Sequence, residues 1–237
     1  MKLGKIMSLV LGLSLVLFVI SSPIYSSTED KFGELTNLAD KYDTDKGSSQ
    51  HLYTEVYEYF FYPIKYKAHK ICEIGILDGS SLKMFRDYFP KAVIYGIDIN
   101  NASNLNSDTI KTFVADQANR KLLKDFIDTY GDNFDIILDD GGHTQEQQQV
   151  SFGYLFKYLK RGGYYIIEDV DWELYYSGSF GVQEDATLVM INNFVINQRI
   201  ESKYMTTREK HYLNNNISYC NLLKRKARSI TCIFKKK

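Results

Sequence analysis

The chain has 237 residues, of which 44% are hydrophobic, and equal numbers of basic and acidic residues give a formal net charge of zero at pH 7. This length fits one ordinary domain with a substantial core. The balanced charge argues against a general nucleic-acid binder.

The first 27 residues have the layout of a secretory signal. Lys2 and Lys5 precede an apolar run over 6–20, and small residues follow it. The run is shorter than the roughly 20 residues that comfortably span a bilayer, but it could anchor the chain if the residues after it lie in the membrane interface. We therefore divide the chain into a signal peptide or membrane anchor at 1–27 and a domain at 28–237. An anchored domain would face outward, and a cytoplasmic location is the alternative.

Three cysteines show no metal-ligand spacing. Cys72 lies in an expected core strand and is interpreted as a small buried residue. Cys220 and Cys232 could face each other across a hairpin. A disulfide between them is a hypothesis that depends on the leader, because disulfides persist in oxidising compartments.

Two helices are expected before the first strand. Residues 34–42 carry apolar side chains at helical spacing, and a second helix is expected to start at Thr54. A polar turn that contains Thr44 and Lys46 separates them. The residues alone favour turn and cap chemistry there.

The first strand, loop and helix of an α/β unit follow from residue 70. Gly75 and Gly79 let the backbone turn tightly and approach a ligand, and Ser80 or Ser81 can cap the helix. The next strand ends in Asp98. An acid at the end of the second strand commonly holds ribose hydroxyls, so a nucleoside-bearing cofactor is indicated.

The loop does not have the spacing of a dinucleotide fingerprint. It contains Gly75 and Gly79 but lacks the Gly-x-Gly-x-x-Gly pattern that cradles a pyrophosphate. Glu73 lies at the strand end, where it would repel a phosphate. Both observations favour S-adenosylmethionine, which has no phosphate and carries a positive sulfonium.

A third strand is expected to end in Asp116 and Gln117. A carboxylate and an amide there could hydrogen-bond an adenine edge. The alternative is that they cap the helix at 119–130.

Two further strands end in carboxylates, and a histidine follows the first of them. Because ligand crevices lie at the carboxyl ends of parallel strands, these groups are expected to share one crevice. Their repulsion would be relieved by protonation or by a cation, and carboxylates favour magnesium, calcium or manganese over zinc. The residues are Asp139, Asp140, His143, Glu168 and Asp169.

Strand geometry limits which of these acids reach the crevice. Side chains alternate along a strand, so one of Asp139 and Asp140 is expected to face away. Asp140 is preferred because it lies three residues from His143 across a diglycine turn. Glu168 and Asp169 can both ligate only if the strand unwinds there.

After these strands the chain is expected to form helices at 144–159 and 186–200 and an edge strand at 229–234. Trp172 could wall an acceptor site or simply pack. The pattern predicts an α/β fold with a mostly parallel sheet, helices on both faces and a closing antiparallel edge strand.

An ordered set of motifs now points to a family. The chain resembles magnesium-dependent macrolide-sugar O-methyltransferases of the mycinamicin and macrocin type, with cephalosporin hydroxylase-like proteins as relatives. The resemblance covers about 38–176. The motifs are Lys41-Tyr-Asp-Thr-Asp-Lys-Gly, Tyr53-Thr-Glu-Val-Tyr-Glu, Glu73-Ile-Gly, Ile97-Asp98, Asp116-Gln, Asp139-Asp-Gly-Gly-His143 and Ile167-Glu-Asp169.

The resemblance implies a Rossmann-like methyltransferase fold and a reaction. The enzyme would move a methyl group from S-adenosylmethionine to a hydroxyl of a sugar, on a small molecule or glycan, with Mg²⁺. His143 would be the general base and Asp140, Glu168 and Asp169 the metal ligands. The cofactor residues would be Glu73, Gly75, Asp98, Asp116 and Gln117, with Thr44 and Lys46 from the turn.

Some features depart from the family. Gly142 stands where serine is usual, Asp43 replaces a common glycine, and a leader is not expected. Two rival functions follow: a cephalosporin hydroxylase-like oxidoreductase, and a catalytically inactive secreted binding protein on the same fold. His143 could also merely cap the following helix. The acceptor and any self-association are left open by the sequence.

Overall fold

The structure, a computed structural model, describes residues 32–171, 184–224 and 229–237. The predicted leader at 1–27 lies outside the described residues, and so does Trp172. Within the described ranges, no helix is both long and apolar enough to cross a bilayer.

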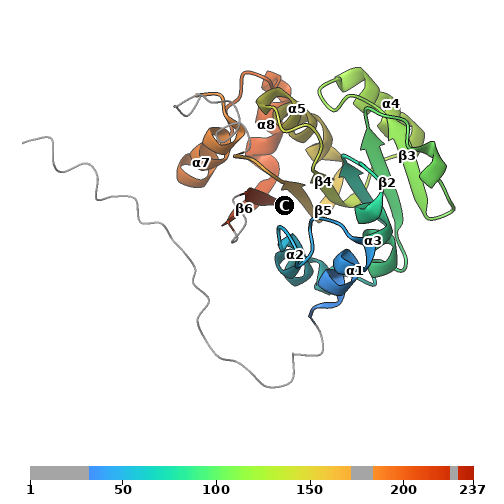
Figure 1. The fold of residues 1–237 in the computed structure, drawn as a ribbon. Helices are drawn as coiled ribbons and strands as arrows, with labels where there is room; N and C mark the ends of the chain where they lie inside the picture. The colour runs from blue at the N-terminus through green and yellow to red at the C-terminus, as the bar shows by residue number, and fades with distance from the viewer. Residues whose placement is uncertain (1–31, 172–183, 225–228) are drawn as a thin grey trace, which may run out of the picture. The chain divides into compact units, whose positions relative to one another are not determined.

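One seven-stranded sheet forms the centre of the unit at 32–237 (Figure 1). The strands follow the order β3-β2-β1-β4-β5-β7-β6. Among these described strands, β1 to β5 pair in parallel and β7 pairs antiparallel with both β5 and β6. Their bounds are β1 Lys70–Ile74, β2 Val93–Asp98, β3 Ile110–Val114, β4 Phe134–Asp139, β5 Leu159–Ile167, β6 Ile217–Lys224 and β7 Ile230–Lys236.

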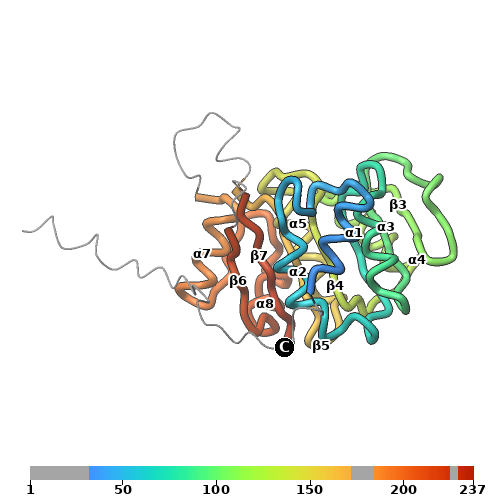
Figure 2. Tube along the Cα trace, turned by 60° about the horizontal axis from the view of Figure 1, so that its bottom comes forward, coloured from blue at the N-terminus to red at the C-terminus, as the bar shows by residue number. Residues whose placement is uncertain are grey.

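Helices cover both faces of this sheet (Figures 1 and 2). One face carries α1 Glu34–Tyr42, α2 Tyr53–Phe61 and α3 Ser80–Tyr88. The other carries α4 Arg120–Tyr130, α5 Gln145–Leu155, α7 Thr187–Asn197 and α8 Thr207–Asn216. Short 3-10 turns occupy Tyr62–Ile64, Ser103–Leu105 and Phe156–Tyr158. The predicted α/β architecture is confirmed.

Side-chain alternation along the central strands builds a separate core on each face. In β4, Ile136 and Leu138 pack with the α1–α3 layer, whereas Ile137 packs with the opposite layer. All three side chains are buried. This burial on both faces explains why the sequence here reads as a continuous apolar run rather than an alternating one.

Several helix starts differ from the sequence prediction. Helix α2 begins at Tyr53 after Leu52, and Thr54 lies inside it, where its hydroxyl donates to the backbone oxygen of Lys46. Helix α3 begins after Gly79, which has φ +80, with no side-chain cap. Ser80 therefore lies in the first turn, where it bonds to Asp78.

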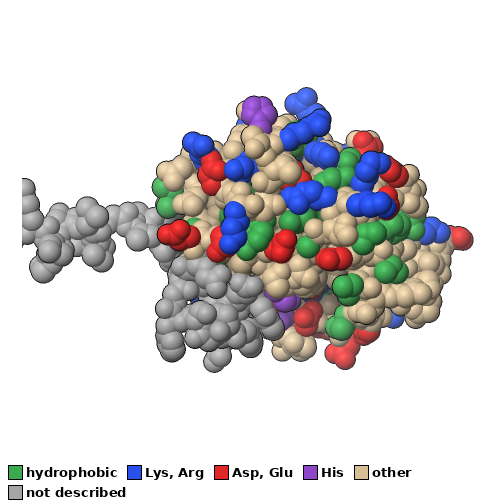
Figure 3. All heavy atoms as spheres, turned by 90° about the horizontal axis from the view of Figure 1, so that it is seen from above, with side chains coloured by type: hydrophobic (Ala, Val, Ile, Leu, Met, Phe, Trp, Pro, Cys, Tyr) green, Lys and Arg blue, Asp and Glu red, His purple; other side chains and the backbone are tan. Residues whose placement is uncertain are grey.

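The C-terminal part contains elements that the sequence pattern did not reveal. The strand predicted at 229–234 is β7, which lies second from the edge of the sheet. Strand β6 forms the edge and pairs with β7, which agrees with the hairpin considered for Cys220 and Cys232, whereas α8 was not predicted. On the face shown in Figure 3, basic and acidic side chains are interspersed rather than gathered into fields of one sign.

Cys72, Cys220 and Cys232 are free thiols. Cys220 lies on β6 opposite Phe234, and Cys232 lies on β7 opposite Leu222, so the two cysteines are diagonal neighbours on adjacent strands. The thiol of Cys232 lowers the pKa of Cys220 by hydrogen bonding, whereas burial raises the pKa of Cys232. Pairing of the two under oxidising conditions stays a prediction.

Candidate functional site

A cavity of about 800 Å³ opens at the carboxyl ends of the parallel strands. This is the edge at which open α/β sheets bind ligands, and the order β2-β1-β4-β5 reverses there, between β1 and β4. Predicted residues that line the cavity are Thr44, Lys46, Gly75, Asp98, Asp116, Gln117, Asp140, His143 and Asp169. Glu73 and Glu168 are buried outside this lining.

The turn after β1 approaches the turn after β4 very closely. Gly75 has φ +89, and a Cβ built on it would lie 2.1 Å from the backbone oxygen of Asp140. A side chain here would therefore be strained and would also collide with backbone. Glycine is required at this position because two strand ends meet at it.

Glu73 lies beneath this turn and is fully buried. Its Oε2 accepts a hydrogen bond from Ser81 at 2.6 Å, and its Oε1 lies 3.8 Å from the ammonium nitrogen of Lys46. Burial raises the pKa of Glu73 to about 7, although Lys46 and Ser81 lower it. Among the described atoms, Oε1 has no hydrogen-bond partner.

Asp98 and Asp116 both accept hydrogen bonds from nearby backbone. Asp98 accepts from the amides of Ile76 and Asn100, each at 2.8 Å, and so joins the β1 turn to the end of β2. Asp116 accepts from the amide of Ala118 at 2.8 Å. Each carboxylate keeps acceptor capacity for a ligand.

Helix α4 is capped by Asn119, not by the two residues for which a capping role was considered. The amide of Gln117 is used inside the protein instead. Its nitrogen donates to Asp139 at 2.9 Å, and its oxygen accepts from the amide of Gly142 at 2.7 Å. Gln117 thus holds the turn after β4.

The two acids at the end of β4 face opposite ways, as strand alternation requires. Asp139 is 1% exposed and is bonded to Ser151 and Gln117. Burial raises its pKa to about 7. The side chain of Asp140 is 21% exposed and lines the cavity. Asp140 therefore faces the crevice and Asp139 does not, whereas the role of Asp140 as a metal ligand stays a prediction.

The chain unwinds after β5, which is the condition for both following acids to reach the site. Strand β5 ends at Ile167, and Asp169 has φ +52, a left-handed conformation. Glu168 accepts from the hydroxyl of Tyr57 at 2.5 Å and from the ammonium of Lys46 at 2.9 Å. Asp169 accepts from the hydroxyl of Tyr53 at 2.7 Å.

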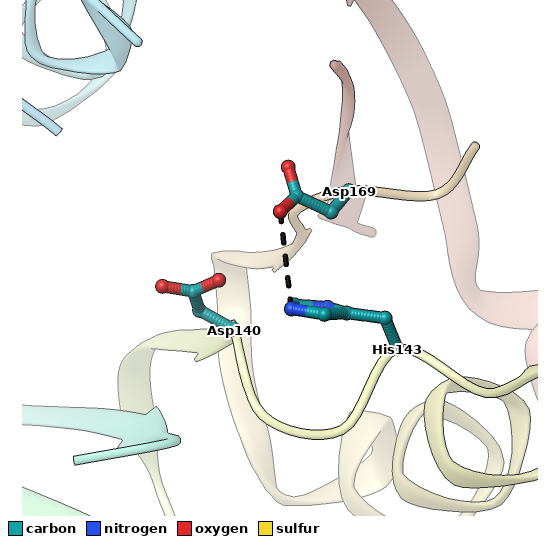
Figure 4. A group of neighbouring side chains, drawn as sticks. All are labelled: Asp140, His143 and Asp169. Atoms are coloured by element: carbon teal, nitrogen blue, oxygen red, sulfur yellow. Dashed lines mark ion pairs between the residues drawn. The ribbon is translucent and has the colours of Figure 1, made fainter. Parts of the chain in front are cut away.

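Asp140, His143 and Asp169 point toward one space at the mouth of these strands (Figure 4). One potential ligand atom from each lies within 4.8 Å of the others. The Nε2 atom of His143 lies 3.8 Å from Oδ2 of Asp169. Glu168 lies outside this group, because its oxygens face Tyr57 and Lys46. Its role as a metal ligand stays a prediction.

Lys46 occupies the centre of the acidic cluster. Its ammonium donates to Asp140 and to Glu168 and lies 3.8 Å from Glu73, and its side chain is 1% exposed. Burial lowers the pKa of Lys46, but the three carboxylates together raise it well above its usual value. The cation that the crowded acids require is thus supplied in part by the chain itself.

Three residues at the site were missed by sequence reasoning. Tyr53 and Tyr57 bond to the acids, and His51 lines the cavity and stacks on Tyr53 with ring centroids 5.0 Å apart. A signal was present, because the two tyrosines are four residues apart on a helix and so share one face. Nothing in the sequence showed that this face meets the end of β5.

The chain is similar to proteins of known function and to solved structures. No family model matches the chain. A tetracenomycin-C 3'-O-methyltransferase of Streptomyces olivaceus, which acts on the 8-demethyl-8-(2-methoxy-alpha-L-rhamnosyl) form, is 35% identical over 156 residues, or 63% of this chain. Demethylmacrocin O-methyltransferase of Streptomyces fradiae is 36% identical over 159 residues, or 64% of this chain. Mycinamicin VI 2''-O-methyltransferase of Micromonospora griseorubida is 35% identical over 159 residues, also 64%.

The chain resembles sugar O-methyltransferases. It spans about two fifths of the length of these relatives, covering 40%, 40% and 39% of them. The structure of the MycE methyltransferase in complex with Mg, SAH and mycinamycin VI superposes with a TM-score of 0.70 and 28% identity, over 86% of this chain and 54% of that one.

The fold is therefore the Rossmann-like methyltransferase fold, and the family resemblance predicted from the motifs is confirmed. The suggested relationship to cephalosporin hydroxylase-like proteins stays a prediction.

Proposed function

We propose that this chain is an S-adenosylmethionine-dependent O-methyltransferase that methylates a hydroxyl of a sugar, on a small molecule or glycan. The observation that carries the proposal is the shared crevice. A glycine turn and Asp98 line one side of it, and Asp140, His143 and Asp169 line the other. The similarity to sugar O-methyltransferases supports this choice of reaction.

The residues on the β1–β3 side fit S-adenosylmethionine, which when bound supplies an electrophilic methyl group. Asp98 and Asp116 offer carboxylate oxygens at the cavity, where nucleoside hydroxyls and amino groups need acceptors. Glu73 is buried beneath the turn and outside the lining of the cavity, so its contact with the cofactor stays a prediction. Gly75 keeps the floor of the cavity free of a side chain.

The residues on the β4–β5 side fit a divalent cation such as Mg²⁺, which when bound makes a sugar hydroxyl easier to deprotonate. Asp140 and Asp169 supply hard oxygen donors within reach of one ion. Glu168 would join them by releasing Lys46 from Oε2 while Tyr57 stays bonded to Oε1.

His143 is the proposed general base. Its side chain lies in the cavity with Nε2 facing Oδ2 of Asp169. A sugar hydroxyl is too weak an acid to ionise at neutral pH, so a positioned base contributes typically 10²–10⁴-fold. The Asp169 carboxylate would stabilise the imidazolium that forms when the proton arrives.

The leader raises a separate proposal about location. We propose that residues 1–27 direct the domain into the secretory pathway or anchor it to a membrane, because a basic end, an apolar run and small residues follow in that order. Fractionation of the full chain and of a variant lacking 1–27 tests this. Equal distribution of the two proteins would contradict it.

Calorimetric titration of the purified full chain with S-adenosylmethionine, with and without Mg²⁺, tests the enzymatic proposal. We expect binding in both conditions and methylation of a sugar acceptor in a screen with Mg²⁺. His143→Ala and Asp140→Asn should bind the cofactor and lose methyl transfer. Full transfer by both variants would refute the mechanism, and absence of binding by the wild type would favour an inactive binding protein on this fold.

A further inference from the structure

Helix α2 buries four polar side chains along a single motif, Tyr53-Thr-Glu-Val-Tyr-Glu58. Two of them serve the packing of neighbouring elements. Thr54 bonds to Thr36 and to the backbone of Lys46, and Glu58 accepts from the amides of Gly33 and Leu35. The other two are the tyrosines, and their hydroxyls are directed elsewhere.

Each tyrosine donates to one of the adjacent acids after β5. The hydroxyl of Tyr57 lies 2.5 Å from Oε1 of Glu168, and that of Tyr53 lies 2.7 Å from Oδ1 of Asp169. The tyrosines are 1% and 4% exposed. Buried hydroxyls of this kind need a partner, and a charged acceptor makes the bond strong.

The spacing of donors matches the spacing of acceptors. Residues four apart on a helix lie on one face, about 5–6 Å apart at Cβ, and the two tyrosine rings have centroids 6.0 Å apart. Adjacent residues in an extended strand would point in opposite directions. The left-handed backbone at Asp169, with φ +52, brings both carboxylates to the same helix face.

Each tyrosine bonds to one oxygen of its acid and leaves the other oxygen directed at the site. Oδ2 of Asp169 faces His143 at 3.8 Å, and Oε2 of Glu168 accepts from Lys46 at 2.9 Å. A non-glycine residue holds a left-handed conformation only when its surroundings fix it. Tyr53 and the hydroxyl of Ser229 both bond to the inner oxygen of Asp169 and provide that fixation.

We propose that Tyr53 and Tyr57 are positioning residues for the divalent cation site, with Tyr53 orienting Asp169 toward the cation and Tyr57 fixing the rotation of Glu168 beside it. This rests on the proposed metal-assisted function. Groups that orient metal ligands typically change metal affinity 10–100-fold when removed. The two phenol hydroxyls should therefore influence the cation affinity although neither touches the cation.

Titration of the full chain with Mn²⁺, followed by the loss of the free-ion electron paramagnetic resonance signal, tests this directly. We expect Tyr53→Phe to weaken Mn²⁺ binding 10–100-fold and Tyr57→Phe to weaken it several-fold. The bound-ion spectrum should broaden in both variants, because the ligands become less ordered. A phenylalanine keeps the ring packing and removes only the hydroxyl.

Tyr88 on α3 provides the matched control. It is fully buried, and among the described residues its hydroxyl has no hydrogen-bond partner. Tyr88→Phe should leave Mn²⁺ affinity and the bound-ion spectrum unchanged. A thermal melt of each variant without metal measures any general loss of stability separately.

Each outcome bears on a different claim. Wild-type affinity in Tyr53→Phe would overturn its positioning role and leave it a core tyrosine. If that variant does not fold, Tyr57→Phe decides in its place, because wild-type affinity there would equally overturn the paired arrangement. Absence of Mn²⁺ binding by the wild type would instead refute the metal part of the proposed function, and this inference with it.

Discussion

The two sides of the cavity are built in different ways. On the β1–β3 side, acids bond to backbone amides, two residues away for Asp98 with Asn100 and Asp116 with Ala118, and 22 residues away for Asp98 with Ile76. On the β4–β5 side, acids bond to side chains far away in the sequence. Lys46 and Glu168 are 122 residues apart, and Tyr53 and Asp169 are 116 apart. The first side depends on local turns, and the second depends on how the N-terminal segment docks.

This difference indicates on which side of the cavity the loss of one side chain should weaken the neighbouring interactions as well. A local turn keeps its hydrogen bonds even if a distant element moves, because both partners belong to it. A cluster assembled from remote segments fails as a unit when one member is lost. Substitutions on the β4–β5 side should therefore cost more stability than substitutions of similar size on the β1–β3 side.

Lys46→Met gives the largest expected effect. It removes the ammonium shared by Asp140, Glu168 and Glu73 and leaves buried carboxylates uncompensated. We expect a loss of about 3–5 kcal/mol in the free energy of unfolding, measured with urea. The control is Lys41→Met, whose ion pair with Asp87 is exposed to solvent and should contribute little to the free energy of unfolding. Equal losses would show that the cluster is not coupled.

Gly75→Ala tests the point where the two sides meet. The new Cβ would collide with the backbone of Asp140 at a positive φ, so we expect a loss of about 3 kcal/mol and of cofactor binding. Gly162→Ala is the control, because Gly162 has φ +75 but nothing within 4 Å of its Cβ position. It should lose about 1 kcal/mol. Urea unfolding that finds the two variants alike would contradict the close approach.

Glu73→Gln tests the buried acid between the two sides through pH dependence. Glu73 has a pKa of about 7 in the folded protein, above its ordinary value, so the folded state holds a proton that the unfolded state has lost between about pH 4.5 and 7. Wild-type stability should therefore fall as pH rises through that window, by up to about 3 kcal/mol from this group. The variant should lose the part of this fall that comes from Glu73 and keep the part from Asp139, whose pKa burial also raises to about 7.

Urea unfolding at several pH values between 5 and 8 measures that slope. Asp87→Asn serves as the control, because Tyr42, Arg86 and Lys41 outweigh burial and lower the pKa of Asp87 to about 2. Its contribution is lost only as pH falls toward 2, so this variant should shift the curve without changing the slope above pH 5. A wild-type slope in Glu73→Gln would contradict the raised pKa.

Asp98→Asn gives the smallest expected effect and tests the β1–β3 side of the cavity. The amide keeps one acceptor for the backbone and loses the charge and the second acceptor. We expect S-adenosylmethionine affinity to fall roughly tenfold, about 1.4 kcal/mol, and the free energy of unfolding to fall by about 1 kcal/mol, because one of the two backbone amides loses its acceptor. Asp128→Asn, an exposed acid paired with Lys124 on α4, should not change affinity. Calorimetric titration of both variants with S-adenosylmethionine measures this difference in affinity.

The local side was largely predictable from sequence, because its signals lie within a few residues of one another. Gly75 follows the apolar strand β1 and Asp98 ends the apolar strand β2, and strand ends of a parallel sheet meet at one edge. On the β4–β5 side, alternation predicted that one of Asp139 and Asp140 faces the cavity, and the short separation from His143 across the diglycine turn selected Asp140.

The residues that bond to the acids on the β4–β5 side from far away in the sequence could not be predicted in the same way. Lys46 was expected to act in the cofactor turn, and only the docking of that turn places its ammonium among the acids. Helix α8 was also missed. Helix α8 carries a single buried residue, Leu213, so it lacks an apolar stripe.

The docking of the segment around Lys46 has a consequence for biosynthesis. Lys46 leaves the ribosome 122 residues before Glu168, and Tyr53 leaves it 116 residues before Asp169. Helix α2 therefore has no carboxylate partner for most of the time that the domain is being translated. Contacts of such long sequence separation form slowly. The N-terminal helices should therefore become resistant to proteolysis on a nascent chain only after residue 169 has emerged, although they are the first to be made.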